Sequence, residues 1–112
     1  MGISTHILDT ALGRPAAGVP IALWQWQGED WVLLHSAITD SDGRVKHLLP
    51  EEQPLEPGIF RVRFDTAAYY EAKVLDGLYP YVDVVFEVRA EQAHYHIPLL
   101  VTANGYSTYR GS

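Results

Sequence analysis

The amino-acid sequence predicts an all-β protein, a sandwich of seven to eight short strands with one short helix. Apolar and polar residues alternate with a period of two in short runs, which is the pattern of strands with one face in a core. Gly, Pro and Asp separate these runs, as they do at the tight turns of β-sandwiches. No internal repeat or flexible linker interrupts the chain, so we expect a single domain over residues 1–112.

Three strands are expected in the first third of the chain. Residues 4–8 form the first strand, and a loop covers residues 13–18. Residues 19–26 form the second strand, with alternate apolar side chains on one face. Residues 28–30, Gly-Glu-Asp, are expected to turn this strand into a third at residues 31–37.

A turn and a proline-rich loop organise the middle of the chain. Asp40-Ser41-Asp42-Gly43 is a strong turn signal that delivers Arg44 to the start of a short strand. The proline-rich loop follows, and residues 59–64 then alternate as a strand. The side chains expected on the inner face of that strand are Phe60, Val62 and Phe64.

One helix and three strands are expected in the rest of the chain. Asp65-Thr66 supplies an N-cap candidate, and residues 67–74 are mostly good helix formers. Residues 81–89 and 94–102 show the clearest alternation of the chain. Asn104-Gly105 then turns the chain into a last short strand at residues 106–109.

Composition excludes several classes of function. The formal charge is −6 and no stretch is basic, which argues against a nucleic-acid partner. There is no cysteine, so neither a disulfide nor a thiolate nucleophile is available. No apolar run approaches the roughly 20 residues of a membrane span, and the first residues lack the pattern of a signal peptide. We therefore expect a soluble, cytoplasmic protein without a membrane partner.

The run His94-Tyr95-His96 is the most informative local arrangement. Because side chains alternate along a strand, His94 and His96 share one face and Tyr95 points to the other. The same alternation puts His6 opposite Ile7. Three interpretations remain open from the residues alone: ordinary surface histidines, a zinc site with His6 as a third ligand, or acid–base catalysis by imidazoles that titrate near about pH 6.5.

Other chemistry-bearing residues have a structural explanation as well as a functional one. Arg44 is either a solvated turn residue or a rigid fork of donors for a planar, oxygen-rich ligand. Asp40 and Asp42 are turn formers before they are catalytic carboxylates. Three tryptophans are expected in the core and on the sheet faces rather than on a stacking platform: Trp24, Trp26 and Trp31.

The last seven residues, 106–112, combine two tyrosines, two hydroxyl residues, an arginine and a terminal serine with its carboxylate. A chain end is normally frayed and dispensable, so this concentration of chemistry is either incidental or functional. No Gly-x-Ser-x-Gly elbow, phosphate-binding loop or dinucleotide fingerprint is present. The residues alone therefore indicate a β-sandwich with a candidate His/Arg site for an unknown substrate.

Several separated motifs match one family across essentially the whole chain. They are Ser4-Thr5-His6-Ile7-Leu8-Asp9-Thr10 with Gly13-Arg14-Pro15-Ala16, Asp42-Gly43-Arg44, His94-Tyr95-His96-Ile97-Pro98-Leu99-Leu100 and Gly105-Tyr106-Ser107-Thr108-Tyr109-Arg110-Gly111-Ser112. In these motifs the sequence resembles the 5-hydroxyisourate hydrolases of the transthyretin-like family. The opening motif is shared by many sandwiches of this fold. The last four residues together with His-x-His are far more selective.

The resemblance implies a transthyretin-like sandwich and hydrolysis of 5-hydroxyisourate to 2-oxo-4-hydroxy-4-carboxy-5-ureidoimidazoline in urate degradation. It implies a homotetramer, a dimer of dimers with the sites in the channel between dimers, and neither a metal nor an organic cofactor. The implied catalytic residues are His6, Arg44, His96 and Ser112, and the implied substrate-binding residues are His6, Arg44 and Tyr109. His94 is expected to support the site. The expected mechanism is histidine-assisted attack of water on the ring carbonyl, with Arg44 stabilising the oxyanion.

Three rival interpretations keep the sandwich but change the function. A non-catalytic transthyretin-like protein would bind a small ligand and would need no His/Arg set. A structural or adhesion sandwich would tolerate any ending. A zinc hydrolase would use the histidines as metal ligands.

Overall fold

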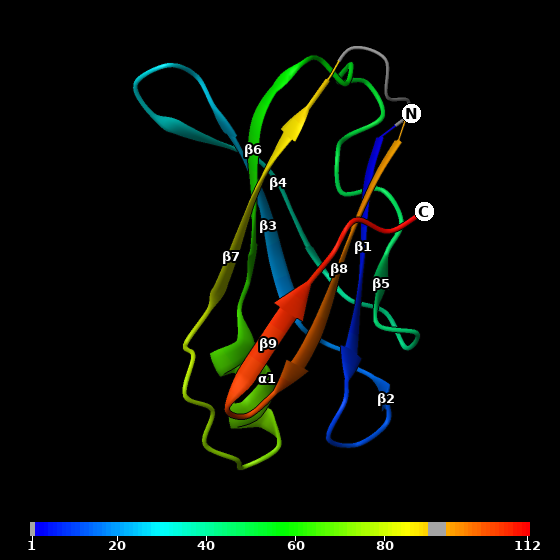
Figure 1. The fold of residues 1–112 in the computed structure, drawn as a ribbon, viewed down its shortest axis with the longest axis vertical. Helices are drawn as coiled ribbons and strands as arrows, with labels where there is room; N and C mark the ends of the chain where they lie inside the picture. Colours follow the sequence, from blue (N-terminus) through cyan, green and yellow to red (C-terminus); the bar gives the residue numbers. More distant parts are fainter. Residues whose placement is uncertain (1, 90–93) are drawn as a thin grey trace.

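Two β-sheets packed face to face, with one short helix at one end, make up the computed structural model, which describes residues 2–89 and 94–112 (Figure 1). The elements in chain order are β1 (Gly2–Asp9), β2 (Arg14–Pro15), β3 (Pro20–Trp26), β4 (Trp31–Ile38), β5 (Arg44–Val45), β6 (Gly58–Phe64), α1 (Thr66–Ala72), β7 (Val82–Val88), β8 (His94–Thr102) and β9 (Gly105–Thr108).

The five-stranded sheet joins the two ends of the chain. Its order is β2-β1-β8-β9, and β5 pairs with the same edge of β1 as β2 does. β1 and β8 run parallel, whereas the other pairs in this sheet are antiparallel. The second sheet is antiparallel throughout, in the order β4-β3-β6-β7.

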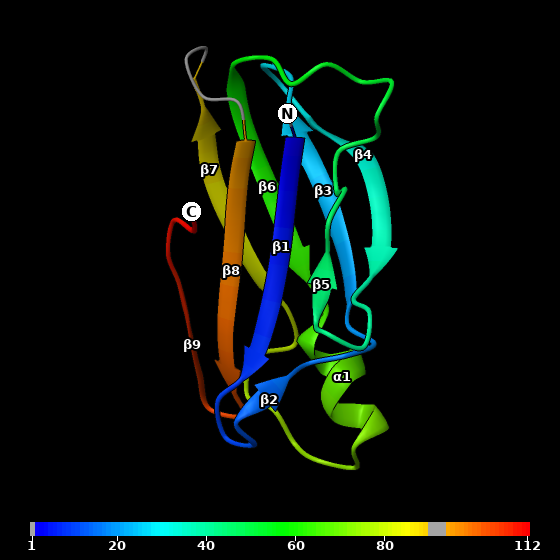
Figure 2. The same cartoon turned by 90° about the vertical axis from the view of Figure 1, so that its right-hand side faces the viewer.

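The core lies between the two sheets and consists of the alternate residues that face inward. Ile3 and Ile7 of β1 and Leu99 of β8 are almost fully buried against Leu23 and Phe60 of the opposite sheet. The predicted inner faces are confirmed for β3, β6, β7 and β8. The outer face of the β1–β8 pair is therefore free to carry polar residues (Figure 2).

The helix follows β6 and is held by an N-cap hydrogen bond and by one buried hydrogen bond between a tyrosine and an aspartate. The Asp65 side chain accepts a hydrogen bond from the backbone N–H of Ala68, so the predicted N-cap is confirmed. The hydroxyl of Tyr69 donates to the carboxylate of Asp9 at 2.7 Å, which ties the helix to the end of β1. Burial and this carboxylate raise the pKa of Tyr69. The helix ends earlier than predicted, and Val74 beyond it has a left-handed φ of 55°.

The sequence-based prediction of seven or eight strands is one strand short. Residues 13–18 were expected to be a loop, but Arg14–Pro15 pairs with Leu8 and Asp9 and forms β2. Two residues are too few to show a period of two, so no pattern could reveal this strand. The other strand boundaries differ from the prediction by at most two residues.

The tryptophans lie on the outer face of the second sheet rather than in the core. Trp24 and Trp31 flank the guanidinium of Arg61, which lies 5.1 Å and 4.6 Å from the two ring centroids. The prediction of sheet-face positions is therefore confirmed for these two, and the core prediction is wrong because Leu23, not Trp24, points inward. Among the residues described, no helix is long and apolar enough to cross a membrane.

Candidate active site

Three strands of the five-stranded sheet bring the predicted residues to one place. β1 and β8 pair with Ser4 opposite His96, and β5 pairs with the other edge of β1 with Arg44 opposite His6. Their neighbours in the chain point into the core, so these four side chains point outward. Residues about ninety positions apart in the sequence therefore meet on one surface.

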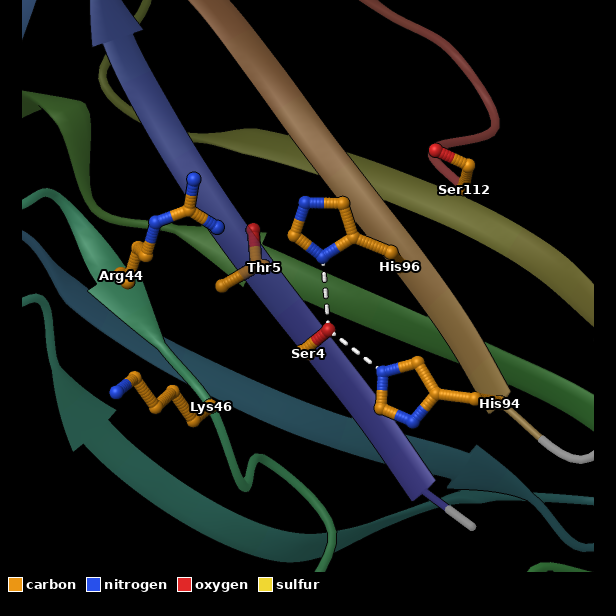
Figure 3. A pocket seen from close by; sticks show the side chains of 7 residues that line it. All are labelled: Ser4, Thr5, Arg44, Lys46, His94, His96 and Ser112. Atoms are coloured by element: carbon orange, nitrogen blue, oxygen red, sulfur yellow. Dashed lines mark hydrogen bonds between the residues drawn. The ribbon is translucent and has the colours of Figure 1, made fainter.

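A cavity of about 440 Å³ lies on this surface (Figure 3). It is lined by Ser4, Thr5, Arg44, Lys46, His94, His96 and Ser112. Three of the four predicted catalytic residues, Arg44, His96 and Ser112, thus line one cavity. The fourth, His6, lies beside it, with its ring stacked on that of His96 at 5.8 Å between centroids and 14° between planes.

The two stacked histidines favour their neutral forms. Burial, followed by the Arg44 guanidinium, lowers the pKa of His6 from its ordinary value. The pKa of His96 is lowered by burial first, and then by the nearby His6, Arg44 and His94. A neutral imidazole has a free lone pair on one nitrogen, so both rings are suited to accept a proton near neutral pH.

The turn before β5 determines where Arg44 lies. The carboxylate of Asp40 accepts the backbone N–H groups of Asp42 and Arg44 at 2.9 and 3.0 Å, and this bonding lowers the pKa of Asp40. Gly43 has a φ of 70°, and a Cβ there would lie 2.5 Å from the carbonyl oxygen of Ile7. Only glycine lets the turn approach β1 this closely, so the Asp-Gly-Arg sequence places the guanidinium beside His6.

Ser4 holds two histidines of β8 together. Its hydroxyl lies 2.8 Å from Nε2 of His94 and 2.7 Å from Nδ1 of His96 (Figure 3). Ser4 is 9% exposed, whereas His94 is exposed to solvent. The predicted sharing of a face by His94 and His96 is confirmed, and their common partner is a serine on the neighbouring strand.

The last residues run back along β8 to the cavity. The Thr108 hydroxyl donates to the carbonyl of Pro98, and the backbone N–H of Gly111 donates to that of His96 at 2.9 Å. A Cβ on Gly111 would lie 2.4 Å from Cδ2 of His96, so the tail lies directly against the imidazole. The chain end is therefore bound to the sheet, and Ser112 reaches the cavity.

Tyr109 lies apart from the other predicted residues in this chain. It is 52% exposed and lines a separate cavity of about 180 Å³, together with Tyr95 and Arg110. The guanidinium of Arg110 lies 5.0 Å from the centroid of the Tyr95 ring, which holds this part of the tail over β8. The substrate-binding role of Tyr109 stays a prediction.

Three polar residues of the cavity, Ser4, Thr5 and Lys46, were not singled out by the sequence analysis, and two of them, Ser4 and Lys46, are spaced to share a face with predicted residues. Ser4 lies two positions before His6, and Lys46 lies two positions after Arg44. Alternation along β1 puts Ser4 on the same face as His6, and Lys46 has the same spacing of two from Arg44, so the signal was present. Neither residue type is unusual at such a position, and nothing in its local sequence distinguishes it from a surface residue.

The zinc interpretation requires three ligands that converge on one point. Within residues 2–89 and 94–112, no three His, Cys, Asp or Glu side chains form a group that could hold a metal ion. His94 and His96 each direct one ring nitrogen to the Ser4 hydroxyl. The arrangement instead provides proton acceptors and a guanidinium on one wall.

Comparison with known proteins gives concordant matches. The model of the HIUase/Transthyretin family matches residues 3–111. A 5-hydroxyisourate hydrolase of Salmonella typhimurium is 46% identical over 110 residues, covering 98% of this chain and 80% of that protein. The structure of Klebsiella pneumoniae 5-hydroxyisourate hydrolase has a TM-score of 0.86 and 31% identity, with both chains fully covered. Sea bream transthyretin in complex with thyroxine has a TM-score of 0.91 and 29% identity, covering 99% of this chain and 95% of that one.

Proposed function

Since the chain belongs to the HIUase/Transthyretin family, we propose that it is a 5-hydroxyisourate hydrolase whose active site is the cavity between β1, β5 and β8. One observation carries this assignment. Arg44, His96 and Ser112 converge on one cavity with His6 stacked beside them, although they come from distant parts of the chain. A site that only bound an apolar ligand would not require this set.

The two histidines supply the base for the reaction. Water is a poor nucleophile until a proton is removed, and a neutral imidazole can take that proton as the oxygen attacks the ring carbonyl. The lowered pKa values of His6 and His96 keep both rings neutral near pH 7. Hydrolysis of the cyclic amide then opens the ring and yields 2-oxo-4-hydroxy-4-carboxy-5-ureidoimidazoline.

Arg44 of β5 and Lys46, which follows that strand, stabilise the negative charge that develops. When water adds to the carbonyl, its oxygen becomes an oxyanion, which a fixed guanidinium stabilises more strongly than bulk water does. Arg44 fills this role, and Lys46 adds a second positive charge on the same wall. The cavity is thus basic in a protein whose formal charge is −6, which favours an oxygen-rich ligand.

The tail completes the cavity on the side of His96. Ser112 lines the cavity because Gly111 is hydrogen-bonded to β8. Its proposed role is to fix the substrate or the imidazole. Tyr109 is proposed to contact substrate, although within one chain it lines a different cavity.

We also propose that four copies of this chain assemble as a dimer of dimers that covers the open cavities. Within the part of the chain that the structure describes, no helix or strand covers the outer face of β1 and β8, which carry the site (Figure 2). Large apolar side chains are also exposed on edge strands of the two sheets, including Val85 of β7 and Tyr106 of β9. A second copy would exclude water from both features.

A binding function without catalysis is the second candidate. It is favoured by the likeness to sea bream transthyretin, which was solved with thyroxine. The two candidate functions differ in what they require of the histidines and Arg44. Binding tolerates loss of a proton acceptor, whereas hydrolysis does not.

The deciding experiment is to generate 5-hydroxyisourate from urate in situ and to follow its ultraviolet decay with and without the protein. Wild-type protein is expected to accelerate the decay. His96→Asn and Arg44→Ala should each lower kcat/KM by about 100-fold or more, the range for removing a general base or an oxyanion partner.

The matched control is His47→Asn, which changes an exposed histidine outside the cavity and should leave the rate unchanged. Decay at the spontaneous rate with wild-type protein would refute the hydrolase assignment and favour binding alone. Near-normal turnover by either cavity variant would refute the role given to that residue.

A further inference from the structure

The Ser4 hydroxyl lies between two imidazole nitrogens. Its single hydrogen limits the ways in which the three groups can be hydrogen-bonded. A hydroxyl has one hydrogen, so Ser4 can donate to only one of the two rings. The ring that does not receive this hydrogen must itself donate an N–H to the serine oxygen. Distances of 2.7 and 2.8 Å correspond to hydrogen bonds on both sides.

The tautomers of the two histidines are therefore linked. In the first arrangement, Nδ1–H of His96 donates to Ser4, and the Ser4 hydroxyl donates to Nε2 of His94. Nε2 of His96 then carries the free lone pair. In the second arrangement both hydrogen bonds reverse, and Nε2 of His96 carries a hydrogen. Only the first arrangement leaves the second nitrogen of His96 free to act as a base.

We propose that Ser4 is a positioning residue that couples His96 to the exposed His94. When His96 takes up a proton, the positive charge is transferred through the serine hydroxyl to His94. This rests on the proposed hydrolase function. Neither Ser4 nor His94 needs to touch the substrate for this role.

The transfer balances in two steps. As water attacks the carbonyl, Nε2 of His96 takes a proton from the water, Nδ1–H of His96 passes to Ser4 Oγ, and the Ser4 hydroxyl hydrogen passes to Nε2 of His94. His96 is then neutral with a hydrogen on Nε2, and His94 carries the positive charge. His96 next donates its Nε2 hydrogen to the leaving ring nitrogen as the C–N bond breaks. The proton returns from His94 through Ser4 to Nδ1, which restores the first arrangement.

Burial and charge favour movement of the charge in this direction. His96 is partly buried, and the charged and polar groups that face it are His6 of β1, Arg44 of β5, Lys46 just after β5, His94 of β8 and Ser112 of the tail. A positive charge on its ring is opposed by burial and by the neighbouring cation, in agreement with its lowered pKa. His94 is exposed, so water can solvate the charge once it arrives.

The linkage can be tested without substrate. We would record the ¹⁵N chemical shifts of the histidine ring nitrogens by NMR, near pH 8, for the wild type, Ser4→Ala, His94→Gln and the control His47→Gln. The proposal expects His96 of the wild type to carry its hydrogen mainly on Nδ1. Ser4→Ala removes the acceptor of Nδ1–H and should shift His96 toward the Nε2–H form. His94→Gln still offers a carbonyl oxygen to the Ser4 hydroxyl and should keep the wild-type tautomer, as should His47→Gln. The same tautomer of His96 in all four proteins would overturn the proposal.

Kinetics of the intact enzyme give the second test. Ser4→Ala is expected to lower kcat by about 10- to 100-fold with little change in KM, because proton transfer is affected and substrate contacts are not. Ser4→Thr retains the hydroxyl and should recover most of the rate. His94→Gln keeps a hydrogen-bonding group but cannot take up the charge, so it should lose as much as Ser4→Ala. The double variant should be little worse than either single variant.

The outcomes separate this proposal from the function on which it rests. If wild-type protein does not hydrolyse 5-hydroxyisourate, the proposed function fails, and the NMR experiment still decides whether the tautomers are linked. If the wild type is active and His94→Gln keeps full kcat, the relay is wrong while the hydrolase assignment stands. Circular dichroism of each variant checks that a lost rate does not come from a lost fold.

Discussion

His6 and His96 show how ordinary residues acquire reactivity from their surroundings. Burial and the Arg44 guanidinium disfavour the charged form of each ring, which suits both histidines to the proposed role of proton acceptor. Their near-parallel stacking at 5.8 Å also makes it unfavourable for both to be charged at once. Reactivity therefore belongs to the cluster and not to one side chain.

The lowered pKa values predict the pH dependence of activity. A free imidazole is half protonated near about pH 6.5. Because burial lowers the pKa of His6 and His96, both rings stay neutral below that pH, and kcat/KM should fall only as the pH drops through the lowered values. We expect a plateau from about pH 6.5 upward and a decline on its acid side. A flat profile from pH 5 to 8 would contradict a histidine base.

The cause of these shifts can be measured separately from activity. Arg44→Ala removes a positive charge beside both rings, so an NMR titration should show the pKa of His6 and of His96 moving up toward the ordinary value. The lowered pKa values of His6 and His96 also make the stability of the folded protein depend on pH. A histidine with a lowered folded-state pKa binds fewer protons in the folded protein than in the unfolded one, so stability should fall as the pH drops below about 6.5. Unchanged pKa values in Arg44→Ala would show that the guanidinium does not contribute to the shifts.

At the scale of elements, alternation was enough to predict most strands, but it did not reveal how they pair. The inner faces and the shared face of His94 and His96 follow from a period of two, which any half-buried strand must show. The parallel pairing of β1 with β8 depends on contacts between distant residues, so no local pattern contains it. β2 was missed for a related reason, since its two residues form a strand only through their partners.

Arg44 and Ser4 show the same difference between what a local pattern reveals and what only the pairing of strands reveals. Arg44 could be predicted because the Asp-Gly turn is a local signal, and Gly43 confirms why that turn needs glycine. Ser4 could not be singled out, because its importance comes from two histidines on another strand. The sequence thus reveals residues with unusual chemistry more readily than residues with unusual neighbours.

The docking of the tail predicts the effect of a small substitution. Gly111→Ala would place a methyl group 2.4 Å from Cδ2 of His96, so either the tail or the ring must move. Because displacement of a catalytic group by about 1 Å can cost about 100-fold in rate, we expect kcat to fall by about 10-fold or more. The rate assay measures this effect, and thermal unfolding should show only a small loss of stability.

Gly105→Ala is the matched control for that substitution. A Cβ at Gly105 would meet only Thr102 Oγ1, at 3.8 Å, which is ordinary contact. This variant should keep its rate. Equal rates for the two alanine variants would mean that the tail does not hold His96 in place.

At the scale of the whole molecule, the open cavity and the exposed apolar residues together predict self-association. A domain of 112 residues buries only about two thirds of its unfolded surface, so covering more of it adds stability. Sedimentation equilibrium should find a species of four subunits at assay concentrations. A monomer with full activity would contradict the proposal that neighbouring copies cover the site.

The parallel pairing of β1 with β8 also has a consequence for how the protein is made. A ribosome releases β1 well before β8, so the edge of β1 that pairs with β8 must wait while the residues between the two strands are made. Pairing of such distant segments is intrinsically slow, because a long loop must close before any contact forms. Appearance of enzymatic activity during refolding would therefore report the pairing of β1 with β8, because the proposed site needs both strands.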